Sequence, residues 1–183
     1  FIVCKDTTYS TYGPVWKFTT EFPPGYVFIE SFNNLSCWTA IGPLGQVNWS
    51  IFPSSNSGGD PPELKLSWSP SFNGLSQLLS CQIEMAAPNC LFLSLRHFCD
   101  WYADPAPFMG LAITYDDGLT STILWEFQPV GGNVGPEEIS ISFIPDSTPF
   151  RLIMYLNGDS FNIDDWYVDE IIIVPYISCP PPY

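Results

Sequence analysis

The residues best suited to chemistry lie near the C-terminal end, in the stretch FNIDDWYVDEIIIV (161–174). Four carboxylates stand in a strand-like run that then becomes wholly apolar: Asp164, Asp165, Asp169 and Glu170. Side chains alternate along a strand, so Asp169 shares its face with Tyr167 and Ile171. A carboxylate among apolar neighbours is poorly placed without a positive partner. The pattern favours cation binding at Asp169, whereas Asp164 and Asp165 have the character of solvated turn residues.

Catalytic residue patterns are weak in this sequence. His97 is the only histidine, it stands in the strand-like LSLRHFC, and neither G-x-S-x-G nor H-E-x-x-H accompanies it. Glycosidases use two carboxylates about 5 to 10 Å apart, and Glu126 or the pair Glu137 and Glu138 offers the residue type without an ordered acidic motif. We therefore expect a core or edge histidine, no catalytic site and no enzyme.

Aromatic side chains are a second candidate for binding, since the chain holds seven Trp and nine Tyr. Flat aromatic rings stack on the apolar faces of sugars as they do on other apolar groups. Three tryptophans stand next to polar or loop sequence and are the predicted ligand-binding residues: Trp49, Trp68 and Trp101. Most tryptophans of a β-sandwich fill its core, which is the expectation for Trp38, Trp125 and Trp166.

The charge balance excludes several classes of partner. Five basic residues stand against 19 acidic ones, a net charge of -14, so the basic footprint of a nucleic-acid binder is missing and anionic membranes would repel the chain. Aromatics reach 16% and charged residues only 13%, which indicates a folded body. No apolar run approaches the ~20 residues of a membrane-spanning helix. Cations are the natural partners.

Cysteine usage points to an oxidising compartment. The six cysteines contain no C-x-x-C pair, so disulfides fit better than a zinc or redox site. Residues 86–89 predict the turn of a second hairpin with Cys81 and Cys90 on its two arms, and their pairing is one of 15 possible connectivities. Asn34-Leu-Ser36 and Asn48-Trp-Ser50 are glycosylation sequons. Because the chain opens on Phe1 in strand-like sequence, we expect a processed piece of a longer secreted protein, extracellular or on a cell surface.

Short strand signals predict an all-β fold. Runs of β-branched and aromatic residues bounded by turn residues occur along the whole chain, without a helical period, and Asp117-Gly118 between two such runs predicts a hairpin whose glycine has positive φ. About ten short strands predict a two-sheet antiparallel β-sandwich of jelly-roll type. The predicted strands are 15–20, 26–32, 64–69, 78–85, 91–98, 110–115, 120–127, 138–143, 150–155 and 166–174.

The sequence divides into four segments. Residues 1–20 predict a β-hairpin appendage that is too short to be a domain, and a lone hairpin is at best marginally stable. Residues 21–25 (EFPPG) predict a stiff linker. The sandwich domain follows over 26–176, with a polar loop at 53–62, and a Pro-rich tail occupies 177–183.

From about residue 26 to 174 the order of features resembles the MAM-like jelly rolls of secreted bacterial adhesins, the cleaved-adhesin or choice-of-anchor group. The matching pieces are FIESFNNLSCWT, NWSIF, LFLSLRHF, ITYDDG and IDDWYVDEIIIV. Residues 1–20, which end in Phe-Thr-Thr before the Pro-rich joint, separately resemble the last two strands of a fibronectin type III module.

The resemblance implies a structural calcium ion between the first and last strands. Calcium takes six to eight oxygen ligands from carboxylates, amides and backbone carbonyls. Carried over by position, Glu30 and Asp169 are the expected carboxylate ligands, with Asn33 or Asn34 supplying an amide or backbone oxygen.

These features favour a non-enzymatic, calcium-stabilised extracellular module for adhesion or for a surface layer. Residues 1–20 could complete a neighbour's sheet by strand addition, and head-to-tail contacts of this kind build filaments. The expected partners are then other copies of the chain or neighbouring modules. The alternative function is a lectin-like carbohydrate-binding module of a larger secreted protein, with glycans as the partner.

Overall fold

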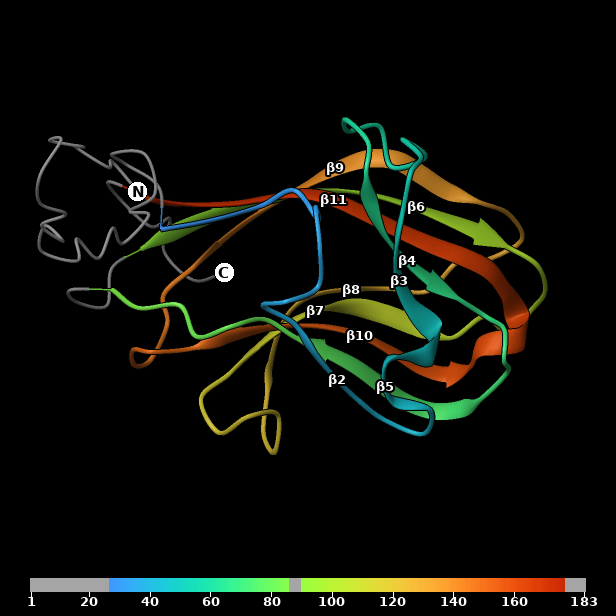
Figure 1. The fold of residues 1–183 in the computed structure, drawn as a ribbon, viewed down its shortest axis with the longest axis horizontal. Coiled ribbons are helices and arrows are strands. Elements are labelled where there is room, and N and C mark those ends of the chain that lie inside the picture. The colour runs from blue at the N-terminus through green and yellow to red at the C-terminus, as the bar shows by residue number, and fades with distance from the viewer. Residues whose placement is uncertain (1–26, 86–89, 177–183) are drawn as a thin grey trace, which may run out of the picture.

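The computed structural model describes residues 27–85 and 90–176 as a two-layered β-sandwich of jelly-roll type (Figure 1). The predicted hairpin at 1–20, the linker at 21–25 and the tail at 177–183 lie outside the described residues. Within the described part, the helical segments are two short 3-10 turns, η1 (Gly45–Asn48) and η2 (Ser160–Asn162), and no helix is long and apolar enough to cross a membrane. The predicted all-β jelly roll is confirmed.

Two antiparallel sheets form the layers. The six-stranded sheet has the order β3-β4-β11-β6-β9, and β1 also pairs with β11. The five-stranded sheet has the order β2-β5-β10-β7-β8. The strands are β1 (Phe28–Glu30), β2 (Thr39–Ile41), β3 (Trp49–Phe52), β4 (Glu63–Ser67), β5 (Asn73–Leu79), β6 (Leu91–Trp101), β7 (Phe108–Thr114), β8 (Thr122–Phe127), β9 (Val134–Phe143), β10 (Arg151–Asp159) and β11 (Ile163–Pro175).

Strict alternation along β6 shows how the core forms. Leu91, Leu93 and Leu95 are fully buried between the sheets, while Phe92 and Arg96 lie on the outer face and keep some exposure. β11 follows the same rule with Trp166, Val168, Ile171 and Ile173 in the core. The hydrophobic effect on these alternating residues fixes which face of each strand points inward, since a slip of one residue would expose the whole set.

A bulge interrupts β11 between Asp169 and Ile172. Glu170 has a φ of 51°, in the left-handed region that residues other than glycine enter only at bends of this kind. The extra residue leaves both Val168 and Ile171 in the core, and it places Asp169 on the outer face opposite Arg96.

The structure confirms one predicted hairpin and corrects the other. β7 and β8 pair through the Asp117-Gly118 turn, where Asp117 and Gly118 have φ values of 56° and 91°. The second predicted hairpin, over 78–85 and 91–98, is wrong because β5 and β6 belong to different sheets. Cys81 instead forms a disulfide with Cys37, across a sequence separation of 44.

Candidate functional site

Loop 53–62 lies over the outer face of the six-stranded sheet, at the top of the view in Figure 1, and is organised by one buried carboxylate. Glu63, at the start of β4, is fully buried. Its carboxylate accepts hydrogen bonds from the backbone N–H groups of Asn56 (2.7 Å) and Ser57 (2.9 Å) and from the hydroxyls of Ser57 and Ser54. Four donors around one carboxylate satisfy its charge, so Glu63 holds the loop in a single conformation.

Asp169 lies beneath this loop and is incompletely satisfied. Its side chain is 1% exposed, Oδ1 accepts a hydrogen bond from the Glu170 backbone N–H (2.7 Å), and Oδ2 has no partner in the described part of the chain. A Cβ placed on Gly59 would overlap Oδ2, so the loop backbone approaches the carboxylate as closely as only glycine permits. Burial raises the pKa of Asp169 to about 6, and the charges of neighbouring carboxylates add to the effect.

Glu30 lies elsewhere. It pairs with Ile171 on the core-facing side of the sheet, while Asp169 points outward. Its carboxylate accepts hydrogen bonds from the Phe32 backbone N–H (2.7 Å) and from Trp38 Nε1 (2.8 Å). The structure therefore places the two predicted calcium ligands on opposite faces of the six-stranded sheet.

The predicted amide ligands are also engaged locally. Asn33 Nδ2 donates to Ser31 Oγ (2.9 Å), and Asn34 Oδ1 accepts from the backbone N–H (2.9 Å) and hydroxyl of Ser36. Among residues 27–85 and 90–176, no three Asp, Glu, His or Cys side chains gather closely enough to hold a metal ion. Calcium also accepts backbone oxygens. Of the predicted ligands, Asp169 is therefore the one that fits a cation, because its Oδ2 has no partner in the described part of the chain and lies beneath Gly59. Glu30 is not part of this site.

Three aromatic side chains meet at one end of the sandwich, and we name Trp68, Tyr102 and Phe161 the aromatic end cluster. The ring of Phe161 packs edge-on against Trp68 (centroids 5.4 Å apart) and against Tyr102 (5.5 Å). Tyr102 is 54% exposed and Phe161 47%. The connections that carry these residues lie side by side at the right-hand end of Figure 1. These exposed, adjoining rings are the candidate binding surface at this end of the sandwich.

Hydrogen bonds hold the aromatic end cluster in place. The fully buried hydroxyl of Ser160 donates to the Trp68 carbonyl (3.1 Å) and accepts from the Phe72 backbone N–H (2.9 Å), which ties the β4–β5 connection to η2. The Asn162 carbonyl accepts from the backbone N–H of Tyr102 (3.2 Å), which ties the β6–β7 connection to the same turn. These bonds fix the three connections that carry the rings.

Two of the three tryptophans predicted to bind ligand lie at this end. Trp68 belongs to the cluster, and Trp101 precedes Tyr102 and donates from Nε1 to Asp104 Oδ1 (3.3 Å). The third, Trp49, is 3% exposed, and its Nε1 donates to Ser76 Oγ (3.0 Å). Its ring has no open face for a sugar, which corrects the expectation for this residue.

Sequence reasoning missed Tyr102 and Phe161, although both carried a signal. Each is a large aromatic residue within a short polar connection, WYADPAP (101–107) and GDSFNID (158–164). The three tryptophans expected in the core occupy it, with Trp38 and Trp166 buried and Trp125 packed against it.

His97 is a core histidine, as expected. It is fully buried, its ring packs against Trp125 (4.7 Å) and Phe127 (4.8 Å), and Nε2 lies 3.0 Å from Glu137 Oε1. Burial lowers the pKa of His97, against the opposing effect of Glu137. The ring is therefore held neutral at physiological pH and faces the core, away from any open cleft.

The carboxylates weighed as a glycosidase pair have separate structural partners. Glu126, on the five-stranded sheet, accepts a hydrogen bond from the Tyr155 hydroxyl (2.6 Å). Glu137 contacts His97, and Glu138 lies 3.5 Å from Arg96, both on the six-stranded sheet. The structure does not assemble them around one cleft.

The outer face of the five-stranded sheet is a second surface. One row across it runs Glu126, Gly110, Tyr155, Gln77 and Ile41, as the strand registers show. The Tyr155 ring is only 6% exposed, and its hydroxyl already donates to Glu126. A Cβ on Gly110 would overlap the Trp125 carbonyl. The glycine therefore allows β8 and the Tyr155 side chain to pack directly against the backbone of β7.

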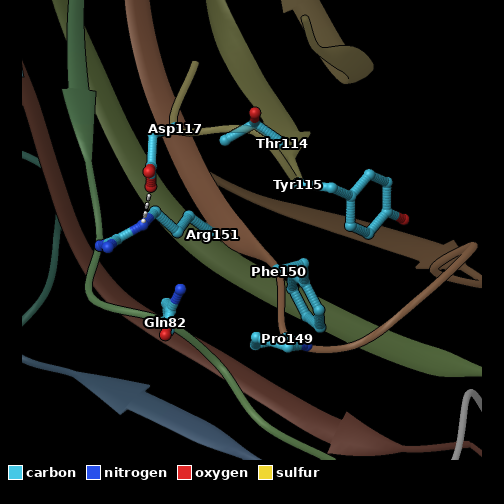
Figure 2. A pocket seen from close by; sticks show the side chains of 7 residues that line it. All are labelled: Gln82, Thr114, Tyr115, Asp117, Pro149, Phe150 and Arg151. Carbon is cyan, nitrogen blue, oxygen red and sulfur yellow. Dashed lines mark hydrogen bonds and ion pairs between the residues drawn. The ribbon is translucent and has the colours of Figure 1, made fainter. Parts of the chain in front are cut away.

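A small hollow opens at one end of this face, at the base of the β7–β8 turn (Figure 2). Arg151, which donates from Nε to Asp117 (2.8 Å), forms one wall, and the rings of Tyr115 and Phe150 lie on the other side. Its volume of about 10 Å³ holds roughly one water molecule. The hollow is therefore too small to receive a sugar ring.

Comparison with known proteins places the fold. No family model and no curated protein sequence matches the chain. The K1 cleaved adhesin domain of Lys-gingipain from Porphyromonas gingivalis W83 is similar in structure, with a TM-score of 0.62, 15% identity, and coverage of 81% of this chain and 98% of that one. TmCBM61, solved with beta-1,4-galactotriose, has a TM-score of 0.58 and 14% identity, covering 80% and 94%.

A third similar structure is the C-terminal family 22 carbohydrate-binding module of Clostridium thermocellum Xyn10B, with a TM-score of 0.54, 14% identity, and coverage of 87% and 100%. The structural neighbours are thus adhesin domains and carbohydrate-binding modules. At these identities the likeness shows a shared jelly-roll fold. It agrees with the resemblance to cleaved-adhesin domains seen in the sequence.

Proposed function

We propose that this chain is a non-enzymatic extracellular binding module whose aromatic end cluster stacks against the sugar rings of a glycan. The observation that carries the proposal is the meeting of three aromatic side chains from three connections, with Tyr102 and Phe161 about half exposed. Water contact with these rings is unfavourable, and a sugar's apolar face would relieve it. A polar side chain for orienting hydroxyls stands beside them at Asn162.

Preorganisation supports the same function. Because Ser160 and Asn162 already tie together the backbone segments that carry the rings, a ligand would lose little free energy to ordering those segments. The fold neighbours are consistent with this proposal, since one was solved with a galactotriose and another is a carbohydrate-binding module. Adhesion is the biological role that such a module would serve.

The test is a glycan array followed by calorimetry on the best hit. We expect Phe161→Ala and Tyr102→Ala to weaken binding about tenfold each, which corresponds to about 1.4 kcal/mol. Phe108→Ala is the matched control, because Phe108 is 44% exposed but lies on the outer face of the five-stranded sheet. Loss of binding in Phe108→Ala alone would move the site to that face, and an array without hits would overturn the proposal.

We further propose that a calcium ion binds at Asp169 beneath loop 53–62. The free, buried Oδ2 of Asp169 is the anchoring ligand, and Asp60, whose charge acts on Asp169, and the loop backbone around Gly59 would supply further oxygens of the type that calcium prefers. Glu30 keeps its structural role under Trp38. The bound ion would join the loop to the sheet and give a partner to Oδ2, the oxygen of Asp169 that is otherwise buried without one.

Self-assembly by strand addition was predicted for residues 1–20, outside the described residues, and stays a prediction. Sedimentation velocity of the full chain, with electron microscopy of any polymer, tests it. A monomer at high concentration would leave adhesion through glycans as the sole proposed role.

A further inference from the structure

Resting on the proposed glycan site, we infer that the aromatic end cluster admits uncharged and amine-bearing sugars and excludes uronates and sulfated sugars. The reason lies in the charges that surround it. The segments 100–104 and 159–165, which frame the rings, hold five aspartates and no basic residue: Asp100, Asp104, Asp159, Asp164 and Asp165.

Three of these aspartates adjoin the aromatic residues directly. The Asp104 carboxylate accepts a hydrogen bond from Trp101 Nε1, and the Asp159 carboxylate accepts one from the Phe161 backbone N–H (3.0 Å). The backbone carbonyl of Asp164 accepts a hydrogen bond from the Trp68 backbone N–H (3.2 Å). All three are exposed and none belongs to an ion pair in the described part of the chain. Their carboxylates face the solvent through which a ligand must pass.

Within the described part of the chain, no basic side chain stands free of an ion pair to receive an anionic sugar. The lysine and arginines within 27–85 and 90–176 are Lys65, Arg96 and Arg151, and each is already in an ion pair. Lys65, which belongs to the strand leading to Trp68, lies 2.8 Å from Asp165 and over the ring of Phe52. An acidic sugar would therefore bring a negative charge to a negative surface without a compensating partner.

A protonated amine on the sugar would raise its affinity for this surface, whereas a carboxylate would lower it. Aromatic rings attract cations through their π-faces, and neighbouring aspartates add Coulomb attraction. At low ionic strength the Debye length is about 30 Å, so all these charges act on a ligand, whereas at 0.15 M it falls to about 8 Å and the effect shrinks. The selectivity is thus electrostatic and must depend on salt.

The experiment compares pairs of sugar oligomers that share a ring type and differ in charge. Galactotetraose is measured against the tetramer of galacturonic acid, and N-acetylated chitotetraose against its deacetylated form, by calorimetry at 10 mM and 150 mM salt. We expect the acidic member to bind at least tenfold more weakly than its neutral counterpart at 10 mM, and the amine to bind more tightly than the acetamide. Both differences narrow at 150 mM.

A double variant, Asp104→Asn with Asp159→Asn, removes two charges while keeping the hydrogen-bond acceptors of both side chains. It should reduce severalfold the ratio of the dissociation constant for the galacturonic acid tetramer to that for galactotetraose. The affinity for galactotetraose itself should change less than twofold. Equal binding of both tetramers by the native chain, or a ratio unchanged in the double variant, overturns the charge selectivity while leaving glycan binding intact. Absence of binding by every sugar overturns the proposed function, and the selectivity with it.

Discussion

Replacing Asp169 by asparagine tests the buried carboxylate most sharply. In the folded chain its pKa is about 6, compared with an ordinary value of 3.8. The folded state thus binds the proton more tightly than the unfolded state, and the stability linked to that proton is present below about pH 4 and lost as pH rises through 6. A difference of about 2 between the pKa values corresponds to about 3 kcal/mol.

The assay is urea unfolding of the native chain and Asp169→Asn in EDTA, from pH 4 to 8. The amide keeps an oxygen for the Glu170 N–H, and its own packing cost is the same at every pH. The free energy of unfolding of the variant minus that of the native chain should therefore rise by about 3 kcal/mol between pH 4 and 7. The exposed Asp104→Asn is the control and should show no such trend.

Calcium supplies the second arm of this experiment. An ion that binds only the folded state stabilises it by about 2.7 kcal/mol at a hundredfold excess over its dissociation constant. The native chain should gain this at pH 7 and Asp169→Asn should not. A stability difference independent of pH would refute the reasoning about the buried charge, and an equal calcium response in both proteins would refute the proposed calcium site.

Three further predictions concern the scaffold. Cys37→Ser with Cys81→Ser should lower the free energy of unfolding in urea by about 4 kcal/mol, because the disulfide closes a loop with a sequence separation of 44; a loss under 1 kcal/mol would contradict this. Burial lowers the pKa of His97, so stability should fall with pH below about 6.5, where the unfolded state takes up the proton, and His97→Gln should weaken that fall in thermal melts at pH 5 to 8. Gly110→Ala should destabilise by about 1 to 3 kcal/mol, since its Cβ would overlap the Trp125 carbonyl, whereas Gly132→Ala meets nothing within 4 Å and should be nearly neutral.

The fold could be predicted from the sequence where burial alternates over long strands. β6 shows this most clearly, because its buried residues stand at every second position from Leu91 to Cys99. In β11 the alternation of Trp166 and Val168 resumes at Ile171 and Ile173 after the bulge at Glu170. β2 has three residues and a mostly exposed pattern, so it carried no such signal. The false hairpin over 78–98 arose because adjacency along the chain suggested pairing, whereas the core requires β5 and β6 in opposite layers.

The candidate site was predictable in part for a similar reason. A large aromatic residue in polar sequence pointed to Trp68, which the structure places in the aromatic end cluster. The same rule failed for Trp49, whose partner Ser76 is 27 positions away and holds the ring inside. Likewise, the loop 53–62 was recognised as polar, yet nothing local shows that Gly59 lies on Asp169. Contacts between distant positions decide both outcomes, and single-sequence patterns do not contain them.

The most direct test of glycan binding is an NMR titration of the seven tryptophan indole N–H signals with the tightest array hit. We expect the Trp68 signal to shift strongly with added sugar, while the signals of buried Trp49 and Trp166 stay in place. A bound sugar that leaves Trp68 unmoved would contradict it.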